Sequence, residues 1–285
     1  MMQEVPSGCP DIPDSRFENP DGSDSVDISV VIPYRHSQAY NALLEFTLQT
    51  LIEQSLPRHR FTIVLTEQDT SPRVGDRVNR YVDRYIFGWS DRPFNRGWGL
   101  NMGFAGNPAR YYCCFDVDFL VDRDFLARQC ARMRGSSPVL RPYRWIRNLT
   151  EEETRNVCTH SMALNAIPLP PAPPTKSVGG ILVFRAHFYR RIGGHLEEFE
   201  GWGYDDTLMA KWCKKLGAWS EGDDLVFHLW HPPHADANKK SALPNKATCD
   251  SCLDWTKEQI YSRGERIVWG DPERYRKASI KAYKL

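Results

Sequence analysis

The chain has 285 residues, of which 41% are hydrophobic and 26% charged, and its formal net charge is +1. This length suffices for one large domain or two small ones with a sizeable core. The near-neutral charge argues against bulk attraction to nucleic acid or to an acidic membrane. No apolar run reaches the length of a membrane span, so none is expected to cross a bilayer.

Residues 1–26 are rich in Pro, Asp, Ser and Gly and are expected to form a poorly ordered leader. This stretch lacks the basic and apolar regions of an export signal. The eight cysteines are irregularly spaced. Reduced thiols and a cytoplasmic location are therefore the expectation.

A strand, a helix and a second strand open the folded part of the chain. The apolar run in VDISVVIPYRH predicts a buried strand that Pro33 ends, and RFTIVLTEQD predicts the next strand. Between them, Ser37 is a good N-cap for a helix with leucines at helical spacing. This order indicates a βαβ unit with parallel strands.

The alternation continues toward the C-terminus. NRGWGLNMGFAG, RDFLARQCARMR and DDTLMAKWCKKLG predict helices, and the last of them is closed by Gly217. RYYCCFDVDFL, SPVLRPYRW, GGILVF and DDLVFHLW predict strands. The proline-rich IPLPPAPPTKS is a break, and residues 232–248 are expected to be a lid or a flexible loop. Such a chain predicts one α/β domain with its chemistry at the carboxyl ends of the strands.

Two aspartates follow a predicted buried strand in CCFDVDFL. Asp116 and Asp118 are two residues apart, so on an extended segment their side chains would point to the same side. Paired carboxylates suit Mg²⁺ or Mn²⁺. The alternative is a turn with solvated acids.

A second acidic pair stands in GWGYDD. Asp205 and Asp206 open a predicted helix, and Trp202 stands three residues before Asp205. They could simply favour the positive end of the helix dipole. They could also provide a general base beside an aromatic platform for carbohydrate.

Three histidines leave a predicted strand in FHLWHPPH. His228, His231 and His234 could join carboxylates on Mn²⁺, or they could be a surface loop. A competing arrangement is a closed zinc site made by His231 and His234 with Cys249 and Cys252.

Arginines flank an aromatic residue in RPFNRGWGLNMGF. Arg92 and Arg96 lie on either side of Phe94, a pattern that can clamp phosphate and stack a base. The alternative is a solvated basic start of a helix. Tyr34 and Arg35 in PYRH offer similar groups after the first strand.

Taken together, these segments resemble the β-1,4-galactosyltransferase family of metal-dependent glycosyltransferases with the GT-A fold. IPYRH, FNRGWGLNMGF, FDVDFL, VGGILVFRAHFYRRIGG, GWGYDD and FHLWH appear in the family's order, across about residues 28–231. The resemblance implies a single Rossmann-like α/β domain at residues 27–248. Its mixed, mostly parallel central sheet would be flanked by helices, and residues 249–285 would be an extension packed on the same domain.

The resemblance also implies roles for the donor side of the site. The nucleotide, diphosphate and ribose would be held by Pro33, Tyr34, Arg35, Phe94, Arg96 and Asp116. Gly180 would let the backbone approach the donor, and Trp202 would close over its phosphate. Asp118 and His231 would ligate Mn²⁺, with Mg²⁺ as the other option. His228 stands where the family has a methionine ligand, so it is a third candidate.

On the acceptor side, the resemblance implies that Asp205 and Trp202 bind the acceptor sugar and that Asp206 is the catalytic base. Ser177 falls where galactose-selective members carry a tyrosine. A small residue there would leave room for the N-acetyl group of UDP-GalNAc.

The implied function is an inverting transfer of Gal or GalNAc from a UDP-sugar to a hydroxyl. The acceptor could be a saccharide, a lipid-linked glycan, a natural product or a peptide. Three alternatives remain at this level: a retaining transferase, a sugar nucleotidyltransferase of related fold, and a zinc-stapled binding module without catalysis.

Overall fold

A single eight-stranded sheet organises the protein in the computed structural model. The structure describes residues 26–135, 137–159, 164–167, 174–232 and 235–276, without the side chains of residues 235–239. The strands lie in the order β3-β2-β1-β4-β7-β6-β8-β5. The pairs β1–β2, β1–β4, β2–β3 and β6–β8 are parallel, and β4–β7, β6–β7 and β5–β8 are antiparallel. The expected mixed, mostly parallel α/β sheet flanked by helices is confirmed.

The element bounds agree with most of the segments predicted from sequence. The strands are β1 Ile28–Tyr34, β2 Phe61–Asp69, β3 Arg84–Trp89, β4 Tyr111–Phe115, β5 Phe119–Leu120, β6 Val139–Asn148, β7 Ile181–Arg185 and β8 Trp219–His228. The helices are α1 Gln38–Ile52, α2 Gly75–Val78, α3 Arg96–Ala105, α4 Phe125–Gly135, α5 Glu151–Cys158, α6 Ala186–Arg191, α7 Asp205–Lys215, α8 Ala235–Leu253 and α9 Lys257–Arg266. Short 3₁₀ turns span Arg58–Arg60 and Leu164–Ala166.

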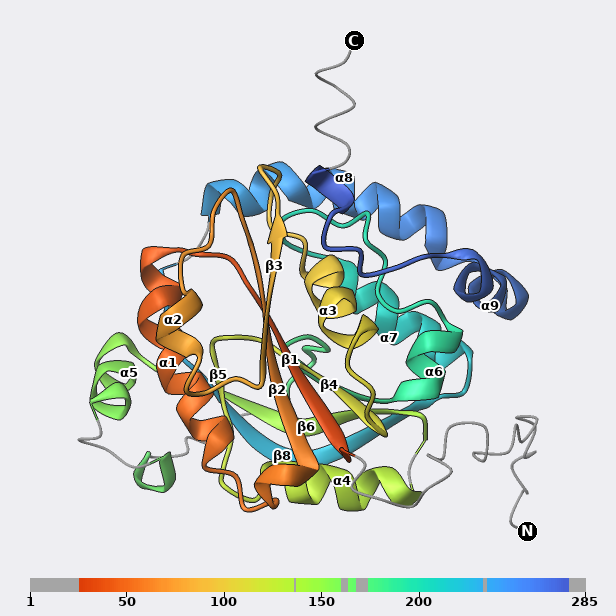
Figure 1. The fold of residues 1–285 in the computed structure, drawn as a ribbon. Helices are drawn as coiled ribbons and strands as arrows, with labels where there is room; N and C mark the ends of the chain where they lie inside the picture. The colour runs from red at the N-terminus through yellow and green to blue at the C-terminus, as the bar shows by residue number, and fades with distance from the viewer. Residues whose placement is uncertain (1–25, 136, 160–163, 168–173, 233–234, 277–285) are drawn as a thin grey trace.

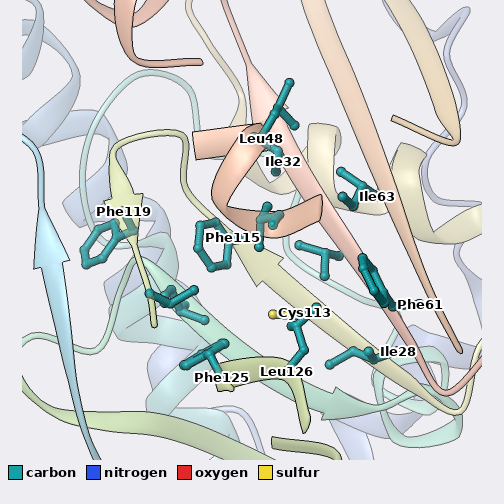
Figure 2. Close-up of a cluster of buried hydrophobic side chains, with 14 of the residues drawn as sticks. Ile28, Ile32, Leu48, Phe61, Ile63, Cys113, Phe115, Phe119, Phe125 and Leu126 are labelled. Atoms are coloured by element: carbon teal, nitrogen blue, oxygen red, sulfur yellow. The ribbon is translucent and has the colours of Figure 1, made fainter. Parts of the chain in front are cut away.

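Two hydrophobic cores lie on the two faces of the sheet, with α1 and α3 on opposite sides of β1 (Figure 1). Alternate strand residues divide between them: Val30 joins the core under α1, and Val31 joins the core under α3. Figure 2 shows the first core, where Leu48 of α1 and Phe125 of α4 lie near Phe115 of β4. Burial on both faces explains the continuous apolar runs of the central strands.

Glycines allow α3 to lie directly on β1. Asn95 caps the helix by accepting a hydrogen bond from the Trp98 backbone N–H. A Cβ added at Gly103 would lie 2.3 Å from Val31 Cγ1, so a side chain there would push the helix off the sheet. This close approach sets the distance between α3 and the sheet. It therefore also sets the position of the residues at the start of the helix.

Residues 235–248 form a helix, so the flexible loop expected at residues 232–248 is wrong for this described part, whereas a role as a lid stays a prediction. Helix α8 begins at Ala235, continues through Pro244 and crosses the expected boundary at 248/249. Sequence patterns miss it because its polar composition and internal proline give no helix signal. The helix is held instead by tertiary contacts: Trp212 Nε1 of α7 donates to the carbonyl of Cys252 at 2.9 Å.

Some expectations fall outside the described residues. The leader expected at residues 1–26 is represented only by Val26, and His234 is also outside. The extension after residue 248 packs on the domain, where Arg263 of α9 donates to the carbonyl of Ile192 at 2.8 Å. The seven described cysteines are free. Among the described helices, none combines the length and apolarity needed to cross a bilayer.

The contact between α3 and β1 makes a stability prediction. Gly103→Ala should lower the free energy of unfolding by about 1–3 kcal/mol, because overpacking against Val31 outweighs the better helix propensity of alanine. Gly135→Ala is the matched control, since a Cβ there would meet no atom within 4 Å. Urea titration measures both variants. A Gly103→Ala protein as stable as the control would show that α3 does not lie this close to the sheet.

Candidate metal and carboxylate site

Pairing between β5 and β8 brings an aspartate and two histidines together. The register sets Phe119 opposite His228, and the Leu229 backbone N–H donates to the Asp118 carbonyl at 2.8 Å. His231 follows His228, the last residue of β8, by three residues. Residues that are distant in the sequence therefore meet because two short strand segments pair at the end of the sheet.

The three side chains converge on one carboxylate oxygen. Asp118 Oδ2 lies 3.4 Å from His228 Nε2 and 3.3 Å from His231 Nε2. One ligand atom from each of the three residues falls within 4.8 Å of the others. Asp118 Oδ1 is buried and has no hydrogen-bond partner among the described residues. One carboxylate and two imidazoles form a donor set that suits Mn²⁺ and other first-row divalent cations, so these residues fit a metal ion.

The electrostatics of this cluster also favour a bound cation. Burial raises the pKa of Asp118, but hydrogen bonds from His228 and His231 outweigh it and leave the pKa below its usual range. The hydrogen bond to Asp118 raises the pKa of His231. The His231 Nδ1–H donates to the Pro232 carbonyl at 3.1 Å, which directs Nε2 toward Asp118. Positive charge is thus stabilised between these three side chains.

A second cluster is centred on Arg96 and includes Asp116, which lies two residues before Asp118 in the sequence. Its Nε donates to Asp116 Oδ1 at 2.6 Å. Its Nη1 donates to Asp206 Oδ1 at 2.8 Å and to Asp205 Oδ2 at 3.4 Å. The Arg96 side chain is only 11% exposed, and its Nη2 is buried without a hydrogen-bond partner among the described residues. One guanidinium therefore joins the carboxylate after β4 to both carboxylates at the start of α7.

Burial, with the charge of neighbouring carboxylates, raises the pKa values of Asp206 and Asp116. Burial raises the pKa of Asp206 to about 8, with Asp205 and Asp116 adding to the rise and Arg96 opposing it. Burial likewise raises the pKa of Asp116 to about 6, against the opposing charge of Arg96. Three negative charges share a single guanidinium, so at least one carboxylate holds a proton more readily than in water. The pair Asp205 and Asp206 therefore does more than favour a helix dipole.

The expected geometry of Asp116 and Asp118 is wrong. The two residues lie in a turn between β4 and β5, closed by the Phe119 N–H donating to the Asp116 carbonyl at 3.3 Å. Their side chains do not share a side as in a strand: Asp116 faces Arg96, and Asp118 faces the histidines. The turn separates the two carboxylates into different clusters.

The segment before β7 runs along the Asp206 carboxylate. A Cβ at Gly179 would lie 2.2 Å from Asp206 Oδ2, and Gly180 has φ +95°, which favours glycine. The Gly180 carbonyl accepts a hydrogen bond from the Asp116 N–H at 3.0 Å. Ser177 is exposed three residues earlier, and its carbonyl accepts from Arg141 Nη1 at 2.9 Å. Gly180 therefore lies between the two acidic segments.

The Trp202 loop, residues 200–204, is held by α8. Trp202 is 62% exposed, while its backbone N–H donates to Ser241 Oγ at 3.0 Å. Asn245 Nδ2 donates to the Trp202 carbonyl at 3.1 Å and to the Glu200 carbonyl at 3.0 Å. Tyr204 ends the loop at φ +72°. The indole is thus presented to solvent from an anchored backbone next to Asp205.

The residues expected to contact the nucleotide after β1 do not all lie near the two clusters. The Tyr34 side chain is buried in the core, so it is not brought to the carboxylates. Pro33 lies beside it at the carboxyl end of β1. Arg35 donates to the backbone carbonyls of Arg92 and, at 3.5 Å, Ser90, which joins the loops after β1 and β3.

Phe94 connects the start of α3 to the Trp202 loop. Its side chain is half-buried, and its carbonyl accepts a hydrogen bond from the Gly201 N–H at 2.7 Å. Arg92, on the same loop, pairs with Glu200 at 2.6 Å. The loop that precedes Arg96 is therefore tied to the loop that carries Trp202.

The alternative zinc site is not formed among the described residues. His231 belongs to the cluster around Asp118, which is the only group of three potential ligands in this part of the chain. Cys249 and Cys252 are buried in the hydrophobic core against α7. His234 lies outside the described residues.

Two buried polar residues at the end of β2 were missed from the sequence. Gln68 Nε2 donates to the Asn95 carbonyl at 2.7 Å, and the Asn95 N–H donates back to Gln68 Oε1 at 3.0 Å. Glu67 accepts hydrogen bonds from the Arg73 N–H and from Tyr85 Oη. The polar run TEQD at the end of an apolar strand was the available signal. Gln68 fixes the residue immediately before Arg96.

Comparisons with known proteins show what this chain is similar to. The family model described as the N-terminal domain of galactosyltransferase matches residues 161–219. A probable glycosyltransferase of Bacillus subtilis, YdaM, is 30% identical over 97 residues, which are 32% of this chain and 22% of that protein. The matched segment is thus about a fifth of the relative's length.

Solved structures of TarS from S. aureus share the fold. Residues 1–349 of TarS superpose with TM-score 0.51 and 13% identity, covering 84% of this chain and 71% of that one. The same fragment in complex with UDP has TM-score 0.50 and 13% identity, covering 87% and 78%. The catalytic domain of Drosophila β1,4-galactosyltransferase 7, in complex with xylobiose, has TM-score 0.44 and 17% identity, covering 69% and 64%. The match of the family model to residues 161–219 confirms the resemblance to galactosyltransferases. The likeness to TarS shows that the chain has the fold of the GT-A glycosyltransferases.

Proposed function

We propose that this chain is an inverting glycosyltransferase that moves Gal or GalNAc from a UDP-sugar to a hydroxyl group with the help of Mn²⁺. The observation that carries the proposal is the adjacency of two clusters: the Asp118, His228 and His231 ligand set, and the three carboxylates on Arg96. A diphosphate leaving group needs positive charge, and an attacking hydroxyl needs a base. The first cluster supports the cation, and the second offers the base.

The leaving-group side is assigned to Asp118 and Arg96. A divalent cation held by Asp118, His228 and His231 would supply positive charge to the departing diphosphate, and Mg²⁺ is the alternative to Mn²⁺. Arg96 has a buried Nη2 without a partner among the described residues, and this N–H is available to donate to a phosphate oxygen. Pro33, Arg35 and Phe94 would contact the nucleotide, with Tyr34 contributing backbone atoms only.

The base is assigned to Asp206. Its raised pKa of about 8 makes it a better proton acceptor than an ordinary carboxylate, and Arg96 holds its Oδ1 in a fixed direction. Asp206 takes the proton of the acceptor hydroxyl as that oxygen bonds to the anomeric carbon and the bond to the diphosphate breaks. A single displacement of this kind inverts the anomeric centre, so an α-linked donor gives a β-linked product.

The donor and acceptor subsites are assigned around this centre. Asp116 would lie near the ribose, Gly180 would let the donor approach the backbone, and Trp202 and Asp205 would bind the acceptor. The exposed indole beside acidic groups is typical of carbohydrate sites. UDP as the nucleotide is supported by the TarS neighbour that was solved with it. Saccharide, lipid-linked, natural-product and peptide acceptors all remain compatible with a hydroxyl nucleophile.

Asp118→Asn tests the metal ligands without any sugar substrate. Loss of the charged ligand should weaken Mn²⁺ binding by about tenfold to a hundredfold, as read from the electron paramagnetic resonance of free Mn²⁺. Asp122→Asn is the matched control, because Asp122 is an exposed aspartate paired with Arg128 a few residues away. Equal Mn²⁺ affinity in the two variants would remove Asp118 from the metal site.

Asp206→Asn tests the base. Its kcat for UDP release with acceptor present should fall by about a hundredfold to ten-thousandfold. The raised pKa of Asp206 means that ionising this side chain lowers the free energy of unfolding of the wild-type protein as the pH rises from about 4 through 8. Asn cannot ionise, so the melting temperature of the variant should be unchanged or higher. Asp250→Asn, at an exposed pair on α8, should leave both quantities unchanged. Near-full kcat in Asp206→Asn would exclude Asp206 as the base.

Ser177→Tyr tests the choice of donor sugar. The larger side chain should reduce turnover of UDP-GalNAc relative to UDP-Gal, because it would fill the space available to the N-acetyl group. Ser177→Ala is the control and should keep the wild-type ratio. Initial rates with the two donors give the ratio for each protein. An unchanged ratio in Ser177→Tyr would refute a role of residue 177 in donor selectivity.

A further inference from the structure

Glu197 is a buried carboxylate outside the two clusters, and it binds groups of α3 and of the segment that follows α9. The Glu197 side chain is 1% exposed, and a buried charge of this kind needs partners. Its Oε1 accepts from Asn101 Nδ2 and from the Gly270 N–H, both at 2.8 Å. Its Oε2 pairs with Arg274. Glu197 thus joins α3 to the segment that follows α9.

The backbone of Glu197 reaches the start of α3 as well. Its carbonyl accepts from Asn95 Nδ2 at 2.7 Å, and the same Nδ2 lies 3.1 Å from Tyr275 Oη. A Cβ at Gly97 would lie 2.7 Å from the Leu196 carbonyl oxygen, so the helix rests directly on this segment. The residues on both sides of Arg96 are therefore fixed by the backbone at residues 196–197.

We propose that Glu197 is a positioning residue for Arg96, acting through α3 and the C-terminal residues 270–275. It makes its contacts with Asn95, Asn101 and the C-terminal segment, whereas Arg96 contacts the carboxylates. Without the Glu197 charge, Asn101, Gly270 and Arg274 lose their common partner. The backbone at residues 196–197 then gains freedom, and with it the first turn of α3 that rests on this backbone. Because Arg96 must hold Asp116 and Asp206 at once, a small shift of this turn misplaces both.

The effect on catalysis rests on the proposed function. Glu197→Gln keeps an oxygen acceptor and nearly the same shape but removes the charge. We expect kcat to fall by about tenfold to a hundredfold, because displacing a catalytic group by about 1 Å lowers the rate on that order. The Mn²⁺ affinity should stay within about twofold of wild type. A purely structural loss would lower the melting temperature without this selective loss of kcat.

A matched control exists on β8. Asp224 has a side chain that is 7% exposed and is held by Arg128, Gln129 and Arg132, so it is a comparably buried and paired carboxylate. Asp224→Asn should lower the melting temperature about as much as Glu197→Gln. It should leave kcat unchanged, because its partners are not on α3.

A second readout separates this inference from the proposed function. The Arg96 Nε–H, bound to Asp116, should give a slowly exchanging ¹⁵N–¹H signal in wild type, assigned by its absence in Arg96→Lys. Glu197→Gln should speed its exchange by about tenfold or more, while Asp224→Asn should not. If no UDP-sugar is turned over, the proposed function fails and this signal still tests Glu197.

The overturning result is an Arg96 Nε–H exchange rate in Glu197→Gln equal to wild type. If Glu197→Gln does not fold, Arg274→Gln replaces it. This variant removes the charged partner of Glu197, and the Arg274 side chain is 35% exposed, so its loss leaves the interior unchanged. Faster exchange of the Arg96 signal in Arg274→Gln supports the inference, and unchanged exchange overturns it.

Discussion

One guanidinium makes the acidic centre of this protein possible. Asp116 follows β4, and Asp205 and Asp206 begin α7. These three partly buried carboxylates would repel one another without a cation among them. Arg96 supplies that cation from the first turn of α3. Three sets of contacts hold this one side chain in place: the packing of α3 glycines on β1, the hydrogen bonds of Gln68 to the Asn95 backbone, and the contacts of Glu197.

The second centre depends on strand pairing rather than on a helix. β5 has only two residues, yet its antiparallel pairing with β8 sets His228 and His231 against Asp118. The turn between β4 and β5 then directs Asp116 toward Arg96 and Asp118 toward the histidines. This short turn therefore separates the two aspartates. Asp118 joins the histidines that we propose hold a cation, and Asp116 joins the guanidinium that also contacts Asp206.

The sequence predicted the fold well because most central strands are buried on both faces and read as apolar runs. It also singled out every member of both clusters. Asp116, Asp118 and the two histidines are polar residues at the ends of buried strands, and Arg96, Asp205 and Asp206 are charged residues at predicted helix starts beside aromatic residues. It could not predict that the side chains of Asp116 and Asp118 would point in different directions, because three residues of a turn and three residues of a strand end have similar sequence patterns. Helix α8 was missed because tertiary contacts hold it despite Pro244, and Glu197 because its partners lie far along the chain.

If the proposed function holds, one metal ion and one UDP molecule bind between these two clusters. The most direct measurement is a crystal structure of the protein grown with Mn²⁺ and UDP, with the metal located by its anomalous scattering. We predict the Mn²⁺ peak against Asp118, His228 and His231, with the diphosphate within reach of Arg96. A peak at other residues, or UDP bound away from Arg96, would contradict the account.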